Sequence, residues 1–383
     1  MSFALETPVV VSSEDERELI VDVLSKLGAS RPESAIQADV LTEGDLRGHH
    51  SHGLQRLPVL ATRIKKRLIR VNSNPDYTWT ADSVLSVDGK DGLGTFVAES
   101  ALSVAKSALG QRGIVAIAIR NSSHLGMIGY YVEKKAREGC ICIAMTVSEA
   151  LVHPHGGTEA LVGTNPIAIG IPGDPEPFVF DMATSVSAIG KILAAKHRGE
   201  SIPHGWAVDA RGNSTTDPDE ALKGALTPAA GAKGYGLGIA IGILAGLLPG
   251  GEIGRLVLGT LDTEHRCTKG DFFLLLNPGA FAGGPTLASR VASYLDELRH
   301  SRPREGCESV IVPGDRSQQP AQQWGTTALI ISRARAASSW RRAAASGSAG
   351  GEPVARRRIG ASSGSLRPAR AARRTLVPRL DWR

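Results

Sequence analysis

The sequence of 383 residues has no run of apolar residues long enough to span a membrane, which takes roughly 18 to 20 in succession. Residues 1–12 also lack the charged start and apolar run of a signal peptide. These two absences predict a cytoplasmic protein with no membrane partner. Because 42% of the residues are apolar and 21% are charged, the chain can bury a sizeable core over two to three domains.

Cysteine is scarce, and its spacing matches neither a zinc site nor the disulfide framework of a small secreted domain. Cys140 and Cys142 alternate with apolar residues, which predicts both thiols on one face of a buried strand. His49, His50 and His52 also lack the companion carboxylate of a His-Glu-x-x-His pattern. We therefore predict no metal site.

Two further motifs are missing. No Gly-x-Gly-x-x-Gly fingerprint follows a first strand, and Gly89-x-x-Gly92-x-Gly94 has the wrong spacing, so a Rossmann domain is not supported. No Gly-x-Ser-x-Gly elbow surrounds Ser51, which disfavours a serine hydrolase.

Positive charge is concentrated at the C-terminal end. Residues 333–383 hold 13 arginines and no lysine against Glu352 and Asp381, a net charge of +11, whereas residues 1–332 carry −5. Residues 317–383 are rich in Arg, Ala and Ser with few large apolar side chains, which predicts a mostly disordered tail. Nucleic-acid binding by this tail is the alternative from another functional class, and a solvated extension explains it as well.

Two helices are predicted near the N-terminus. Ser13-x-x-Glu16 fits a capping box for a helix that ends at Gly28, and Pro32 fits the start of a second helix. Apolar runs and helical periodicity then alternate, which predicts an α/β fold. The predicted strands are 84–87, 114–119, 140–146, 167–171 and 178–181, and the later helices are 96–109 and 184–196.

Ser51-His52-Gly-Leu-Gln-Arg56 combines residue types that reduction of a 2-oxo acid requires. Histidine can donate and accept a proton near neutral pH, and Ser51 can hydrogen-bond to the imidazole. If the chain turns helical after Gly53, Arg56 lies on the same face as His52, where a guanidinium can bind a carboxylate. The pattern also fits a surface loop with a capping serine.

Two later segments carry further candidates. His124 lies just past the predicted strand 114–119, in Arg120-Asn-Ser-Ser-His-Leu-Gly126. Gly231-Ala-Lys233-Gly-Tyr-Gly236 places a lysine beside backbone that can approach a phosphate closely, and it equally fits a turn that begins a helix.

From Asp45 onward the chain resembles the type 2 malate/L-lactate dehydrogenase family, which includes sulfolactate, ureidoglycolate and imine-reducing members. The resemblance covers roughly residues 14–316 and is closest to the archaeal malate/sulfolactate branch. It rests on eight ordered motifs: Asp45-Leu-Arg-Gly-x-x-Ser-His-Gly53, Arg120-Asn-Ser-Ser-His-x-Gly126, His155-Gly-Gly157, Gly163-Thr-Asn-Pro166, Phe180-Asp-Met-Ala-Thr184, Trp206-Ala-Val-Asp209, Thr215-Thr-Asp-Pro218 and Lys233-Gly-Tyr-Gly236.

The resemblance implies a non-Rossmann fold with a largely antiparallel cofactor-binding sheet and helical segments, assembled as a homodimer. It implies NAD or NADP as cofactor and a small 2-hydroxy or 2-oxo acid, such as malate, sulfolactate or lactate, as substrate. His52 or His124 would transfer the proton with support from Ser51, while Arg56 and Thr164 would contact the substrate. The implied cofactor residues are Ser148, Asp181, Met182, Ala183, Lys233, Gly314, Asp315 and Arg316.

Lys191 separates this chain from relatives that reduce cyclic imines, which carry an acid at this position. A lysine facing the site suits a dicarboxylate or sulfonate, although a solvated helix lysine is the alternative. An imine or ureidoglycolate oxidoreductase on the same fold remains the second hypothesis. We expect four segments: a helical substrate-site segment at 1–80, an NAD(P)-binding α/β domain at 81–240, the rest of the catalytic body at 241–316, and the tail at 317–383, which resembles nothing in the family.

Overall fold

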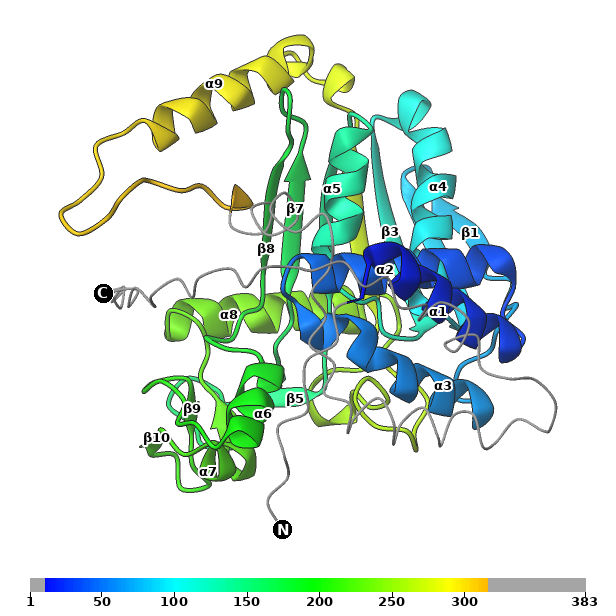
Figure 1. The fold of residues 1–383 in the computed structure, drawn as a ribbon. Coiled ribbons are helices and arrows are strands. Elements are labelled where there is room, and N and C mark those ends of the chain that lie inside the picture. The colour runs from blue at the N-terminus through cyan, green and yellow to red at the C-terminus, as the bar shows by residue number, and fades with distance from the viewer. Residues whose placement is uncertain (1–10, 316–383) are drawn as a thin grey trace, which may run out of the picture.

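The computed structural model describes residues 11–315, which form a mixed α/β fold around one large sheet (Figure 1). Its seven strands follow the order β1-β2-β3-β12-β4-β7-β8. The pair β2–β3 is parallel and the other neighbouring pairs are antiparallel, so the expected largely antiparallel sheet is confirmed. The strands are β1 (Asp76–Ala81), β2 (Val84–Gly92), β3 (Ile114–Ser122), β12 (Asp271–Leu276), β4 (Ile141–Thr146), β7 (Ile167–Ile171) and β8 (Phe178–Met182).

Nine helices surround or extend from this sheet within the described residues. They are α1 (Ser13–Lys26), α2 (Arg31–Leu46), α3 (Leu57–Lys65), α4 (Gly94–Arg112), α5 (Gly129–Arg137), α6 (Ile189–Arg198), α7 (Pro218–Lys223), α8 (Ala232–Ile241) and α9 (Leu287–Arg299). Among residues 11–315, none of these helices combines the length and the apolar character needed to cross a lipid bilayer.

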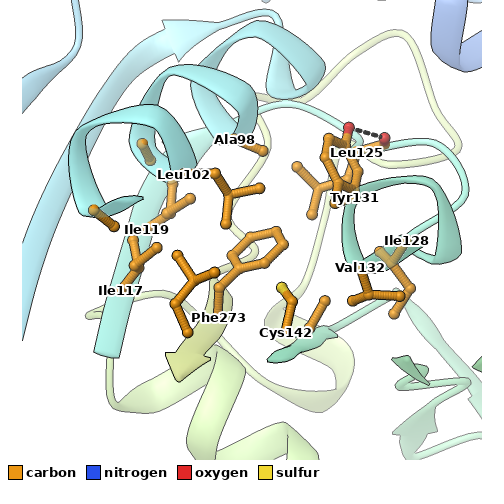
Figure 2. Close-up of a cluster of buried hydrophobic side chains, with 14 of the residues drawn as sticks. Ala98, Leu102, Ile117, Ile119, Leu125, Ile128, Tyr131, Val132, Cys142 and Phe273 are labelled. Atoms are coloured by element: carbon orange, nitrogen blue, oxygen red, sulfur yellow. Dashed lines mark hydrogen bonds between the residues drawn. The ribbon is translucent and has the colours of Figure 1, made fainter. Parts of the chain in front are cut away.

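The main core lies between the sheet and the helices α4 and α5 (Figure 2). Phe273 of β12 is fully buried there, and its ring meets Tyr131 of α5 edge to face with centroids 5.9 Å apart. Cys142 lies in the same cluster and Cys140 at its margin, so the prediction of two buried thiols on one strand face is confirmed. On the opposite face of the sheet, Phe272 packs against α8 and the π-helical segment that follows it, Gly242–Leu247.

The N-terminal helices begin one or two residues away from the predicted caps. Ser12, not Ser13, caps α1, because its hydroxyl accepts a hydrogen bond from the backbone N–H of Asp15. The predicted capping box is therefore wrong, and Glu16 is buried inside the protein instead. Helix α2 begins at Arg31, one residue before the predicted start at Pro32. It has a true capping box, formed by Ser30 and Glu33.

A small sheet lies beside α6 and α7, in the order β10-β9-β11-β5-β6. Helix α6 begins at Ile189 rather than at the predicted Thr184. Residues 184–188 stay outside the helix, as bends with one bridge between Ser185 and Pro228, because the Val186 N–H donates to the Thr227 carbonyl and the Thr184 N–H donates to the Thr164 carbonyl. The strands are β10 (Ser214–Thr215), β9 (Ala207–Val208), β11 (Ala225–Leu226), β5 (Ala150–Val152) and β6 (Val162–Gly163).

Candidate active site

Ser51 and His52 lie on a short loop directly after α2. The chain forms two successive 3-10 turns, His50–His52 and Leu54–Arg56, before α3 begins, so the predicted helical turn after Gly53 is present. The Ser51 hydroxyl lies 3.0 Å from Nδ1 of His52. The His52 side chain is partly buried.

His124 follows the end of β3, and its ring lies beside that of His52 with centroids 5.4 Å apart and planes tilted by 30°. The backbone N–H of Gly126 donates a hydrogen bond of 2.9 Å to Nδ1 of His124. Because a backbone N–H can only donate, this bond places the proton of the neutral ring on Nε2. Tyr131 holds the same loop by donating from its hydroxyl to the carbonyl of Leu125 at 2.6 Å, as Figure 2 shows.

Burial and nearby cations disfavour the charged form of both rings. Desolvation, with Arg56 as the next cause, lowers the pKa of His52 from 6.5 to about 4. The same two causes lower the pKa of His124 well below its usual value, and Lys269 adds to the effect. Both imidazoles are therefore neutral near pH 7.

Arg56 is held against a loop from a distant part of the chain. Its Nη2 donates to the carbonyl of Thr260 at 3.1 Å. Glu149 holds that loop in turn by accepting from the backbone N–H groups of Thr260 at 2.8 Å and Leu261 at 2.9 Å. The guanidinium keeps further N–H groups that can face a carboxylate.

Arg63 is a second guanidinium that the sequence arguments missed. It lies seven residues after Arg56, a spacing of about two helical turns that could have identified it. Its side chain is buried and donates to the carbonyl of Asp262 at 2.7 Å. A cavity of about 10 Å³, close to the room that one water molecule needs, lies between Arg56, Arg63 and His124.

Lys269 and Asp271 form a fully buried ion pair below His124, and they were also missed as site residues. Lys269 Nζ lies 2.5 Å from both carboxylate oxygens of Asp271. Asp271 also accepts hydrogen bonds from Ser122 at 2.8 Å and Thr146 at 2.5 Å. This network fixes the end of β3, from which His124 projects.

The first turn of α6 packs against Ser51. A Cβ atom added to Gly190 would lie 2.9 Å from Cβ of Ser51, so only a glycine permits this approach. The exposed Lys191 is the next residue, with its Nζ 5.9 Å from the centre of the Trp206 ring. Its charge lowers the pKa of His49, although burial and Arg47 contribute more.

A second group of side chains, which we call the hydroxyl cluster, consists of Ser148, Thr164 and Thr184. Ser148 Oγ lies 3.1 Å from Thr164 Oγ1 and accepts a hydrogen bond of 2.9 Å from the Thr164 backbone N–H. The Thr184 backbone N–H donates to the Thr164 carbonyl, and that of Ala229 donates to the Thr184 carbonyl. These bonds join the ends of β4 and β8 to the segment that leads into α8.

The remaining cofactor candidates lie along the strands and turns around the hydroxyl cluster. Asp181 is near the end of β8 and accepts a hydrogen bond of 2.8 Å from the backbone N–H of Gly129, while Met182 and Ala183 continue toward Thr184. Lys233 is exposed in the first turn of α8, so the turn predicted to begin a helix is confirmed.

The C-terminal candidates lie near the beginning of β8. A Cβ added to Gly314 would lie 3.1 Å from the carbonyl of Val179, so this turn rests on the strand. Asp315 forms an ion pair with Arg299 at 2.8 Å. Arg316 and the predicted disordered tail, 317–383, lie outside the described residues.

Two links join the histidine pair to the hydroxyl cluster. Glu149, which supports the loop that holds Arg56, is the neighbour of Ser148 in the chain. The non-helical segment 184–188 leads from Thr184 to the first turn of α6, where Gly190 lies against Ser51. The two groups of candidate residues are therefore linked, with imidazole and cationic side chains on one side and hydroxyl and backbone groups on the other.

Comparison with known proteins agrees with this geometry. The family described as malate/L-lactate dehydrogenase matches residues 11–334. The chain is 41% identical over 309 residues to L-sulfolactate dehydrogenase of Methanocaldococcus jannaschii, covering 80% of this chain and 89% of that protein. It is 37% identical over 310 residues to ureidoglycolate dehydrogenase (NAD(+)) of Escherichia coli strain K12, covering 79% and 87%.

A solved structure supports the same assignment. The crystal structure of a dehydrogenase from Sinorhizobium meliloti superposes with a TM-score of 0.83 at 43% identity, covering 90% of this chain and 99% of that one. With a matching family over most of its length and relatives above 35% identity, the chain belongs to the malate/L-lactate dehydrogenase family.

Proposed function

We propose that this protein is an NAD(P)-dependent dehydrogenase of small 2-hydroxy acids. The observation that carries the proposal is the neutral histidine pair beside Arg56, because oxidation of a hydroxy acid needs a base for the hydroxyl proton and a cation for the carboxylate. Arg56 binds the carboxylate, which would bring the hydroxyl between the two imidazole rings.

His52 is the group that takes the hydroxyl proton. Its Nδ1 faces the Ser51 hydroxyl, which can either donate or accept a hydrogen bond. Ser51 can therefore stay bonded to the ring both before and after Nε2 gains a proton. In the reverse direction, protonated His52 returns that proton to the oxygen of a 2-oxo acid.

His124 has a different role, because the Gly126 N–H opposes a proton on its Nδ1. A charged ring needs protons on both nitrogens, so this contact disfavours it. His124 therefore donates a hydrogen bond from Nε2 to the substrate oxygen and keeps its proton throughout. Thr164, predicted to contact substrate, bonds to Ser148 and would lie at the border with the cofactor.

The residues around the hydroxyl cluster fit a nicotinamide dinucleotide. Gly231, with φ of 60°, precedes α8, and a Cβ at Gly234 would lie 1.9 Å from the Ala229 carbonyl, so the chain turns tightly here and the exposed Lys233 supplies a cation that a phosphate can approach. When bound, the nicotinamide supplies or accepts the hydride. The residues that would hold the dinucleotide are Ser148, Asp181, Met182, Ala183, Lys233, Gly314 and Asp315, with Arg316 as a further candidate.

Lys191 supports a substrate with a second anionic group. It places a cation next to the helix turn that contacts Ser51, where the second carboxylate of malate or the sulfonate of sulfolactate could bind. Ureidoglycolate oxidation is the second candidate function, favoured by the E. coli relative with that name. Ureidoglycolate carries one carboxylate and a neutral ureido group.

A steady-state panel tests the reaction and its specificity together. Malate, sulfolactate, lactate and ureidoglycolate are each supplied with NAD or NADP, and the reduced nicotinamide is followed by its absorbance. We expect the highest kcat/KM with malate or sulfolactate. No turnover with any pair would overturn the proposal, and selective use of ureidoglycolate would favour the second candidate.

We also propose a homodimer. The segment from α8 to Leu248 carries large apolar side chains that are exposed in the single chain. The exposed fractions are 40% for Leu244, 47% for Leu247 and 61% for Leu248. A group of exposed large apolar side chains on one segment is typical of a protein interface. Sedimentation should show a dimer, and Leu244→Asp should shift it toward a monomer.

A further inference from the structure

Asp45, in the last turn of α2, has no part in the proposed chemistry, yet it bonds to both sides of the loop that carries the proposed proton-transfer pair. Its Oδ2 accepts a hydrogen bond of 2.6 Å from the backbone N–H of Leu54. Its Oδ1 lies 2.7 Å from Nδ1 of His50. Ser51 and His52 are enclosed between these two contacts.

The loop closes tightly around this carboxylate. A Cβ added to Gly53 would lie 2.1 Å from the carboxyl carbon of Asp45, and a Cβ added to Gly44 would lie 2.9 Å from the carbonyl oxygen of His52. Both glycines therefore allow the loop to pass in contact with α2. The position of the His52 backbone depends directly on where the Asp45 side chain sits.

The charge of Asp45 is directed at the loop. Its side chain is only 2% exposed, and the neighbouring acid, Glu16 of α1, lies on its buried side. Burial, followed by the charge of Asp45 and a hydrogen bond with it, raises the pKa of Glu16 to about 8, which favours the neutral form of Glu16 beside the Asp45 carboxylate. The hydrogen bond to Asp45 raises the pKa of His50, which favours the protonated form of the ring that faces this buried carboxylate.

We infer that Asp45 is the positioning residue that fixes Ser51 and His52 for proton transfer, through the Leu54 N–H on one side and the His50 ring on the other. The inference rests on the proposed function for the role of His52. Asparagine at position 45 would keep the shape but replace one of the two acceptor oxygens with a donor amide, so it could not accept from both the Leu54 N–H and the His50 ring.

The test compares Asp45→Asn with Asp39→Asn, a matched change on the same helix, where Asp39 forms a half-exposed ion pair with Arg17. Malate with NAD or NADP is the probe. We expect Asp45→Asn to lower kcat about 100-fold, the effect typical of a catalytic group displaced by about 1 Å, with the cofactor dissociation constant unchanged. Asp39→Asn should stay within about twofold of the wild type. Folded Asp45→Asn with wild-type kcat would overturn the inference.

A second readout does not depend on turnover. In ¹⁵N-histidine NMR spectra of the full chain, the signals of His52, identified by their loss in His52→Ala, should move in Asp45→Asn and not in Asp39→Asn. If the wild type is inactive with every acid but these signals move, the proposed function fails and the positioning role stands. Unmoved signals would contradict the positioning role.

If Asp45→Asn does not fold, Gly53→Ala replaces it in both measurements, because its added methyl displaces the Asp45 carboxylate without removing the charge. We expect the same loss of kcat and the same movement of the His52 signals. Wild-type kcat in Gly53→Ala would overturn the inference.

Discussion

The two histidine loops place their rings 5.4 Å apart but hold them differently. On the loop after α2, Nδ1 of His52 faces a hydroxyl, which can reverse the direction of its hydrogen bond. On the loop after β3, Nδ1 of His124 faces a backbone N–H, which can only donate. The hydrogen-bond partner of Nδ1 thus distinguishes the two rings. The His52 ring can exchange a proton, whereas the His124 ring can only donate a hydrogen bond from Nε2.

Among the substitutions that test this comparison, removal of the His52 imidazole should lower kcat/KM the most. We expect His52→Ala to lower kcat/KM for hydroxy-acid oxidation about 1000-fold, since general base catalysis contributes on this scale. The dissociation constant of NADH, measured by fluorescence, should not change. His300→Ala, at an exposed position directly after α9, is the control and should keep wild-type kinetics. A His52→Ala enzyme within tenfold of the wild type would show that another group takes the proton.

Removing the charge of Arg56 should affect both binding and the His52 ring. We expect Arg56→Gln to raise KM about 100-fold, because a charge-assisted carboxylate contact is lost. Oxidation needs neutral His52, so kcat/KM should fall as pH drops through a pKa of about 4 in the wild type. Loss of the neighbouring cation should move that fall to higher pH. Arg255→Gln, at a surface ion pair with Glu159, should change neither quantity.

The smallest effect is expected at Lys191. If it contacts the second anionic group, Lys191→Ala should raise KM for malate about fivefold and leave KM for lactate unchanged, because an exposed charge contact is weak. Lys196→Ala on the same helix, where Lys196 pairs with Asp219, is the control. Equal changes for malate and lactate would contradict a role in selecting the second anion.

Much of the fold could be predicted because its elements carry strong local signals. The predicted strand 167–171 coincides with β7, where five residues run without a polar side chain. Helix α6 begins later than the predicted Thr184 because hydrogen bonds to Thr164 and Thr227 keep residues 184–188 out of the helix. Pairing between distant segments overrides local preference there.

The least predictable feature of the fold is β12, which was not among the predicted strands. It lies between β3 and β4, so a late segment of the chain pairs with two much earlier strands. Such pairing depends on contacts far apart in sequence, which local periodicity does not contain.

Some residues of the candidate site could likewise be predicted from a short stretch of sequence, and others could not. Ser51, His52 and Arg56 could be proposed from side-chain chemistry within one short segment, whereas the residues around the hydroxyl cluster other than Lys233 were proposed only through family resemblance. Glu149 and Lys269 were missed because their partners are a backbone loop and a buried carboxylate that only the folded chain brings near.

The most direct test of the assigned roles is the kcat/KM of His52→Gln beside that of His124→Gln. A glutamine amide can donate a hydrogen bond from about the position of Nε2 but cannot exchange a proton under these conditions. We predict that His124→Gln stays within about tenfold of the wild type, whereas His52→Gln loses about 1000-fold, as much as His52→Ala. The opposite order, with His52→Gln active and His124→Gln inactive, would contradict the account and assign proton transfer to His124.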